Sequence, residues 1–193
     1  MALFSTAYWA PVSYYQLAAQ APFVQIEQYE HYQKQSYRNR CTILSANGSL
    51  SLVVPVLRPR QCEIKDVRID YSKPWQQSHW RALEAAYRSA PFFEEFNTDI
   101  RLIYQNEIPF LFDLNIKIWE LSQLLLSVSL PWGFTEHFVP LSDSVDDYRF
   151  LIHPKMKCIQ ESSQSYFQVF AHKFGFTPDL SILDLILNKG ALY

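Results

Sequence analysis

The cations best placed to bind an anion lie in a polar segment, residues 32–40, that contains no aliphatic side chain. They are Lys34, Arg38 and Arg40, and in an extended strand these even-numbered residues share one face. Three neighbouring cations repel one another unless an anion lies between them. The planar guanidinium group of arginine also matches the geometry of a carboxylate or a phosphate. The segment therefore predicts a binding site for a small anionic substrate.

The residues around these cations support two interpretations. Tyr14 or Tyr37 would orient a bound anion, and Asn39 belongs to the same polar segment, so all three complete the predicted substrate-binding set. Glu27 and Glu30 are equally able to supply the counter-charge, in which case the cations belong to a structural ion-pair network. The sequence leaves both interpretations open.

Two of the five histidines are candidates for the general base of a transfer reaction. His153 stands before Pro154 in a polar turn, a setting in which functional side chains are common. His79 falls on the apolar face of a predicted helix beside Trp75, which is also typical of a histidine that only fills the core. We therefore predict His79 and His153 as the catalytic candidates, with a purely structural role as the alternative for His79.

The sequence carries no motif for a known cofactor or metal. The four glycines lie more than a dozen residues apart, so the glycine-rich loops that bind nucleotides are absent. No two histidines have HxxxH spacing, and the three cysteines are too far apart for a CxxC zinc site. The cofactor is therefore unidentified and no metal ligand is predicted. Glu27 would be the obvious carboxylate if the reaction used magnesium.

Charge and hydropathy limit the partners and the location. Residues 34–88 carry ten Lys or Arg and four Asp or Glu, a net charge of +6, whereas residues 89–193 carry seven and thirteen, a net charge of −6. The acidic part opposes a polyanion, and no RNP or recognition-helix pattern accompanies the basic part, so we predict no nucleic-acid partner. We predict no membrane span and, because residues 1–23 lack a basic start, no signal peptide. We expect a cytoplasmic protein, and no pattern indicates its oligomeric state.

The elements that position these residues follow from the hydrophobic pattern. Short apolar or alternating runs predict strands over residues 2–8, 23–27, 41–44, 50–56, 67–71 and 148–152. Apolar stripes at helical spacing predict helices over residues 14–21, 75–87, 91–101, 111–125 and 162–174, and a last helix from Ser181 to Gly190. Asn47-Gly48 predicts a hairpin turn, so at least one strand pair is antiparallel and the predicted sheet is mixed.

Several of these motifs together resemble the WbqC-like protein family, in the short form associated with Bacteroidetes-type bacteria. The resemblance covers nearly the whole chain and rests on Tyr37-Arg38-Asn39-Arg40, Asn47-Gly48, Ile152-His153-Pro154-Lys155 and residues 180–185. The family is named after a protein encoded in an O-antigen biosynthesis cluster, so the resemblance implies a bacterial role in surface-polysaccharide assembly. Because that link is genomic, it identifies no reaction.

Pattern and resemblance together give one overall expectation. The fold class is α/β, with a mixed sheet in the N-terminal part and a helical C-terminal part packed on it. We expect a single domain over residues 1–193, mainly sheet in 1–71 and mainly helical in 72–193. The expected function is group transfer from an anionic activated precursor. The alternatives are a non-catalytic module that binds a small acidic metabolite or a partner protein, and magnesium-dependent nucleotidyl transfer.

Overall fold

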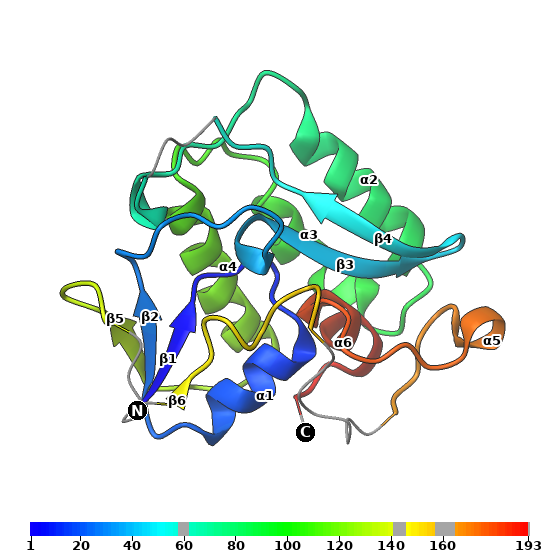
Figure 1. Cartoon of the computed structure of the whole chain (residues 1–193). Helices are drawn as coiled ribbons and strands as arrows, with labels where there is room; N and C mark the ends of the chain where they lie inside the picture. The colour runs from blue at the N-terminus through cyan, green and yellow to red at the C-terminus, as the bar shows by residue number, and fades with distance from the viewer. Residues whose placement is uncertain (58–61, 141–145, 157–164, 193) are drawn as a thin grey trace.

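Four parallel strands form the central sheet of the protein (Figure 1). The structure is a computed structural model that describes residues 1–57, 62–140, 146–156 and 165–192. In their order across the sheet, the strands are β5 (Trp132–Phe134), β2 (Val24–Glu27), β1 (Ala2–Ser5) and β6 (Asp146–Asp147). Helix α1 (Val12–Gln20) connects β1 to β2, as a parallel pair requires. Because β1 and β2 are almost wholly buried, both faces of the sheet are covered there.

The antiparallel hairpin forms a second, separate sheet. Its strands are β3 (Arg40–Ser45) and β4 (Gly48–Val53), and Ser45 lies opposite Gly48. The backbone of Gly48 has a φ of +102°, a conformation that favours glycine, at the turn predicted from the sequence. The α/β class is thus confirmed. In detail, the parallel and antiparallel strands lie in two sheets rather than in one mixed sheet.

The helices of the second half match the predicted stripes. α2 (Trp75–Tyr87), α3 (Phe93–Leu102) and α4 (Leu111–Leu125) each lie over the apolar stripe that predicted a helix there. The last helix, α6 (Ile182–Lys189), begins where the Ser181 hydroxyl accepts the Leu183 N–H and ends at a left-handed Gly190. In Figure 1 the hairpin lies alongside α2, and α6 lies between the hairpin and α1.

Three predicted elements differ in the structure. In the strand predicted over residues 67–71, side chains 67–69 alternate between buried and exposed. Only isolated bridges at residues 68 and 69 pair this segment, which follows the 3-10 turn η2 (Ile64–Asp66). Residues 148–152 form turns after β6 rather than a strand. Of the helix predicted over 162–174, residues 162–164 lie outside the described residues, and the rest contains only the short α5 (Ala171–Phe174).

One hydrophobic cluster joins side chains from both halves of the chain. It includes Phe4 and Ile26 from the parallel sheet, Leu83 from α2, Ile118 from α4 and Ile186 from α6. The sheet itself also draws on both halves, because β5 and β6 come after residue 72. Among the helices of the described ranges, none has the length and apolar character that a membrane crossing needs.

Candidate functional site

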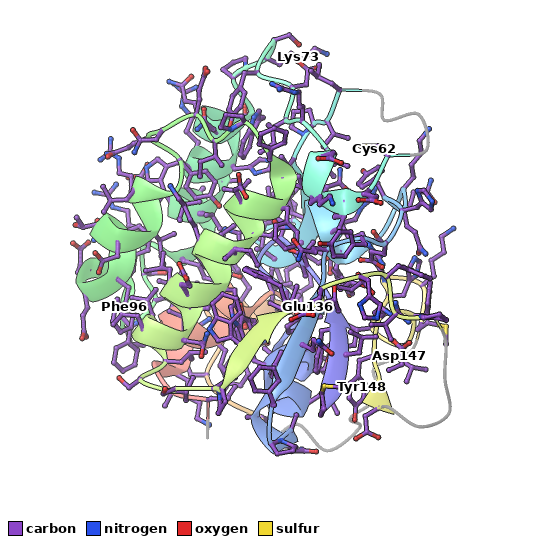
Figure 2. The ribbon with its side chains drawn as sticks, turned by 90° about the vertical axis from the view of Figure 1, so that its left-hand side faces the viewer. Cys62, Lys73, Phe96, Glu136, Asp147 and Tyr148 are labelled. Carbon is purple, nitrogen blue, oxygen red and sulfur yellow. The ribbon has the colours of Figure 1, made fainter. Side chains whose placement is uncertain are left out.

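A narrow crevice lies at the carboxyl ends of β1 and β6. The chain passes from β1 to β2 on one side, whereas β6 lies on the other side of β1, so the strand order reverses here. In open α/β sheets, ligands bind outside the carboxyl ends of the strands at such a point. Figure 2 labels Asp147 and Tyr148, which lie at the end of β6 beside β1. The crevice is lined by Ser5, Thr6, Ala7, Tyr14, Tyr37, Arg38, Tyr148, Arg149 and Ile152.

Arg38 is held in the crevice wall by a buried ion pair with Glu30. It lies in the 3-10 turn η1 (Tyr37–Asn39), with only 2% of its surface exposed. The Arg38 Nε donates to Glu30 Oε1 at 2.8 Å, and Nη2 donates to Glu30 Oε2 and to Ser5 Oγ. In the described part of the chain, no acceptor is bonded to Nη1. The ion pair therefore fixes the plane of the guanidinium group and leaves Nη1 able to donate to a ligand.

The turn at η1 changes the predicted arrangement of the cations. Because residues 37–39 are helical rather than extended, Lys34, Arg38 and Arg40 do not alternate along one strand face, and that expectation is wrong. Lys34 is exposed, Arg40 is half-buried at the start of β3, and neither lines the crevice. Glu30 supplies the counter-charge of Arg38, as the structural interpretation requires.

Of the other predicted binding residues, two line the crevice and one does not. Tyr14 and Tyr37 line the crevice with Arg38, and the Tyr14 hydroxyl donates to the Ser5 carbonyl at 2.9 Å. Asn39 is buried away from the lining, where its Nδ2 donates to the Val54 carbonyl at 2.8 Å. The structure thus brings three of the six predicted binding residues into one site.

Glu27 is the last residue of β2, and both oxygens of its carboxylate accept hydrogen bonds within the protein. Its Oε1 accepts from Tyr29 N at 2.9 Å and Thr135 Oγ1 at 2.8 Å, and its Oε2 accepts from Val139 N at 2.9 Å and Arg149 Nη1 at 3.2 Å. With two donors on each oxygen and no exposed surface, Glu27 has no lone pair left for a cation in this arrangement. The magnesium alternative therefore loses the carboxylate on which it was based.

Arg149 lines the crevice but is not among the site residues predicted from the sequence. Its Nε and Nη2 donate to the Asp147 carboxylate, at 3.0 Å and 2.6 Å, and its Nη1 also donates to the Val139 carbonyl at 2.7 Å. Only 2% of its surface is exposed. Because every nitrogen of its guanidinium group is bonded within the protein, Arg149 builds the crevice wall and has little capacity left for a ligand.

The backbone N–H groups at the start of α1, the helix that follows β1, are also hydrogen-bonded within the protein. In many α/β proteins this position binds phosphate through free backbone N–H groups. Here the N–H of Ser13 donates to the Asp179 carboxylate at 2.9 Å, and the N–H of Val12 donates to the Leu180 carbonyl at 3.0 Å. A bound anion must therefore be held by side chains rather than by α1.

His153 follows the crevice residue Ile152, and nearby cations act on its pKa. Partial burial, and then the charges of Lys155, Arg38 and Arg40, lower the pKa of His153 below its ordinary value. The ring is therefore neutral at pH 7. Its Nδ1 accepts the N–H of Lys155 at 3.2 Å, so the neutral ring carries its proton on Nε2. To act as a base through Nε2, the ring must give up this one partly exposed hydrogen bond, at a cost on the order of 1 kcal/mol.

Sequence comparison identifies the family of the chain. The sequence profile of the WbqC-like protein family matches residues 7–157, a range that includes Arg38, Arg149 and His153. The chain belongs to the WbqC-like protein family. The uncharacterized protein Rv1507c of Mycobacterium tuberculosis is 27% identical to this chain in an alignment of 190 positions. The alignment covers 83% of this chain and 80% of that protein. No solved structure matches the chain.

His79 has the environment of a core residue in this WbqC-like protein. Only 6% of its surface is exposed, and its Nδ1 lies 2.9 Å from the Tyr8 hydroxyl, which also contacts the Tyr104 hydroxyl. Its ring packs edge-on against Trp75 at 5.1 Å between centroids. His79 does not line the crevice. Of the two predicted catalytic histidines, the structure brings only His153 close to the crevice residues.

The buried ring of His79 predicts a loss of stability in acid. Burial lowers its pKa from 6.5 to about 4, so between these values the unfolded chain binds a proton that the native protein does not. The free energy of unfolding should therefore fall by roughly 3 kcal/mol as the pH drops from 6.5 to 4. Urea denaturation at several pH values measures this slope. In His79→Asn the contribution should disappear, whereas the exposed-site control His172→Asn should retain it, and equal slopes in both variants would contradict the assignment.

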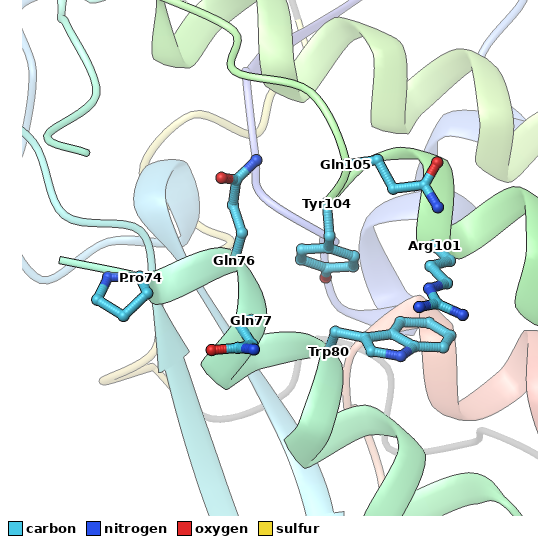
Figure 3. Close-up of a pocket in the computed structure, with 7 residues that line it drawn as sticks. All are labelled: Pro74, Gln76, Gln77, Trp80, Arg101, Tyr104 and Gln105. Carbon is cyan, nitrogen blue, oxygen red and sulfur yellow. The ribbon is translucent and has the colours of Figure 1, made fainter.

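A second, more open groove lies between the start of α2 and the end of α3 (Figure 3). Its lining residues are Pro74, Gln76, Gln77, Trp80, Arg101, Tyr104 and Gln105. Arg101 lies over the Trp80 ring, 5.6 Å from its centroid, and so covers the aromatic surface that a ligand would use. None of the sequence-predicted site residues lines this groove, and the crevice remains the candidate site.

Proposed function

We propose that this WbqC-like protein is a group-transfer enzyme and that its crevice binds the anionic end of an activated precursor. The observation that carries the proposal is the state of Arg38, which lines the crevice with its guanidinium plane fixed by Glu30 and with Nη1 lacking an acceptor in the described residues. A cation fixed before the ligand arrives binds with a smaller loss of side-chain entropy. Such pre-organisation is typical of binding and catalytic sites.

The size of the crevice limits how much of a precursor it takes. Its volume is about 10 Å³, enough for one water-sized group. We infer that an oxygen atom of the terminal anionic group occupies this space and that most of the precursor lies outside the crevice. The charges of Lys155, Arg38 and Arg40 act on His153 and so supply a positive potential around its ring.

His153 is the residue we propose to move the proton of the transfer step. Once the ring is released from the Lys155 N–H, its own proton can be on Nδ1, and Nε2 would then accept the proton of the attacking group while Arg38 holds the anion. The family resemblance supports a place for this reaction in bacterial surface-polysaccharide assembly, in the cytoplasm.

One observation favours a second candidate, a non-catalytic module that binds a small acidic metabolite. In the present orientation His153 has its proton on Nε2, so the neutral ring presents a hydrogen-bond donor. A donor beside a fixed arginine suits anion binding without any proton transfer.

Both candidates require anion binding that depends on Arg38, and a paired substitution tests it. Arg38→Met together with Glu30→Leu removes the cation without leaving a buried unpaired charge, so the fold should persist. We expect phosphate or acetate to shift the NMR signals of His153 and Tyr148 in the wild-type protein. In the double variant the affinity should fall by roughly 10- to 150-fold, because a charge-assisted hydrogen bond contributes about 1.5 to 3 kcal/mol.

The matched control is the partly exposed pair of Lys65 and Glu63, whose charged atoms lie 2.9 Å apart. Lys65→Met together with Glu63→Leu changes the same charges away from the crevice and should leave the affinity unchanged. Anion binding that survives in the Arg38 variant, or that is lost in both variants, would overturn the proposed site.

A further inference from the structure

A small inner pocket adjoins the crevice and shares Thr6, Ala7 and Tyr14 with it. Its remaining walls come mainly from α1, β2 and α4, and they include Asn115 and Trp119. The volume of the pocket is about 10 Å³, which admits one water-sized group. The pocket is therefore too small for a ring but large enough for one polar group of a ligand that extends inward from the crevice.

Three buried polar atoms of this wall have no hydrogen-bond partner in the described part of the chain: Thr6 Oγ1, Asn115 Oδ1 and Trp119 Nε1. Their side chains belong to residues that are 2%, 1% and 4% exposed, respectively. Buried polar groups in native proteins are rarely left unpaired, because each costs free energy when water is removed from it. Three such atoms on residues that line one cavity indicate that a group absent from the bare chain bonds to them.

The orientation of Asn115 is fixed by the crevice itself. Its Nδ2 donates to the backbone carbonyl of Arg38 at 2.8 Å, so Oδ1 is the atom left without a partner. The same residue that borders the inner pocket therefore also holds the turn that carries Arg38. This contact links the geometry of the inner pocket to that of the anion site.

The three free atoms specify the chemistry of the missing group. The Asn115 Oδ1 only accepts, the Trp119 Nε1 only donates, and the Thr6 hydroxyl does either. A single water-sized group that both donates and accepts is a hydroxyl. We propose that the inner pocket receives a hydroxyl group of the ligand whose anionic end binds in the crevice. The inference rests on the proposed function and makes the substrate class an anionic alcohol, such as a hydroxy acid.

Matched acids of increasing length test the proposal. The probes are glycolate, 3-hydroxypropionate and 4-hydroxybutyrate, each compared with acetate, propionate or butyrate of the same chain length. Affinities come from calorimetry, and the indole N–H signal of Trp119 is followed by NMR. We expect at least one hydroxy acid to bind roughly tenfold or more tightly than its parent, because the parent leaves buried polar groups unpaired. That hydroxy acid should also shift the Trp119 indole signal.

Two variants separate the pocket from a general effect on the fold. Trp119→Phe removes the indole donor in the pocket, and Trp75→Phe is the matched control because Trp75 Nε1 is also buried and unpartnered in the described residues but does not line the inner pocket. The preference for the hydroxy acid should fall to within about twofold in Trp119→Phe and persist in Trp75→Phe. Thr6→Val, which replaces the hydroxyl with a methyl group of similar size, should reduce the preference as well.

Each possible result is decisive. Equal affinities for hydroxy and parent acids, with binding still dependent on Arg38, would mean that the pocket holds an ordered water molecule, so the inference fails while the proposed function stands. The absence of binding by every acid would overturn both. A hydroxyl preference that persists unchanged in Trp119→Phe would overturn the inner pocket as its source.

Discussion

Replacing His153 by glutamine is expected to lower kcat/KM for consumption of an activated donor by a factor of roughly 100 to 10,000. Glutamine keeps an N–H donor near the position of Nε2 but cannot exchange a proton there. The ground-state affinity for the anionic ligand should change little. Consumption is measured by mass spectrometry on a panel of nucleotide-sugars and acyl thioesters. The exposed-site variant His172→Gln is the control and should retain the full rate.

A second variant separates proton transfer from hydrogen bonding. His153→Ala removes both the donor and the base, so it should lose as much rate as His153→Gln if the ring moves a proton. If glutamine keeps the rate and alanine alone loses it, His153 only donates a hydrogen bond and the general-base role is wrong. The rate should also fall in acid through a pKa below 6.5, because burial and the neighbouring cations favour the neutral ring.

The helices of this protein could be predicted closely because each buries a single apolar stripe. In α2, for example, Trp75, His79, Leu83 and Tyr87 recur at helical spacing and are all buried. The hairpin was equally predictable, since Asn47-Gly48 supplies the local conformation of its turn. In each case the information is contained in fewer than twenty neighbouring residues.

The sheet and the site depend on contacts that no local pattern contains. β6 has two residues, and its place beside β1 is set by pairing across more than 140 positions of the chain. Arg149 reaches Glu27 across 122 positions, so neither residue's neighbours in sequence reveal the pair. The alternation that predicted a strand at residues 67–71 reflects real burial of Val67 and Ile69, but burial alone does not supply a partner strand.

The pairing of Arg38 was foreseen only as one of two possibilities. Glu30 precedes Arg38 by eight residues, close enough in sequence to suggest an ion pair, yet the anion-binding interpretation was equally consistent with the composition. The structure shows the ion pair and is compatible with anion binding as well, because the carboxylate engages Nε and Nη2 and leaves Nη1 without an acceptor in the described residues. The Nε and Nη2 atoms of one guanidinium group can therefore bond within the protein while its Nη1 is still able to donate to a ligand.

Glu30→Gln is expected to destabilise the protein by about 3 to 5 kcal/mol. The substitution keeps the size of the side chain but removes the charge that balances Arg38, whose side chain in the ion pair is only 3% exposed. A guanidinium group that is left buried without its counter-ion loses the Coulombic attraction while it still bears the cost of leaving water. Urea denaturation monitored by the fluorescence of the five tryptophans measures the loss.

The size of this effect should depend on the presence of Arg38, which distinguishes a charge effect from a packing effect. When Arg38→Met is added to Glu30→Leu, no buried charge remains, and stability should return to within about 1 to 2 kcal/mol of the wild type or exceed it. Arg38→Met alone leaves Glu30 unpaired and Glu30→Leu alone leaves Arg38 unpaired, so each should cost nearly as much as Glu30→Gln. The two losses must therefore be strongly non-additive. Additive losses, or a cost below about 1 kcal/mol for Glu30→Gln, would show that the ion pair does not fix the guanidinium group, and the pre-organised anion site would lose its basis.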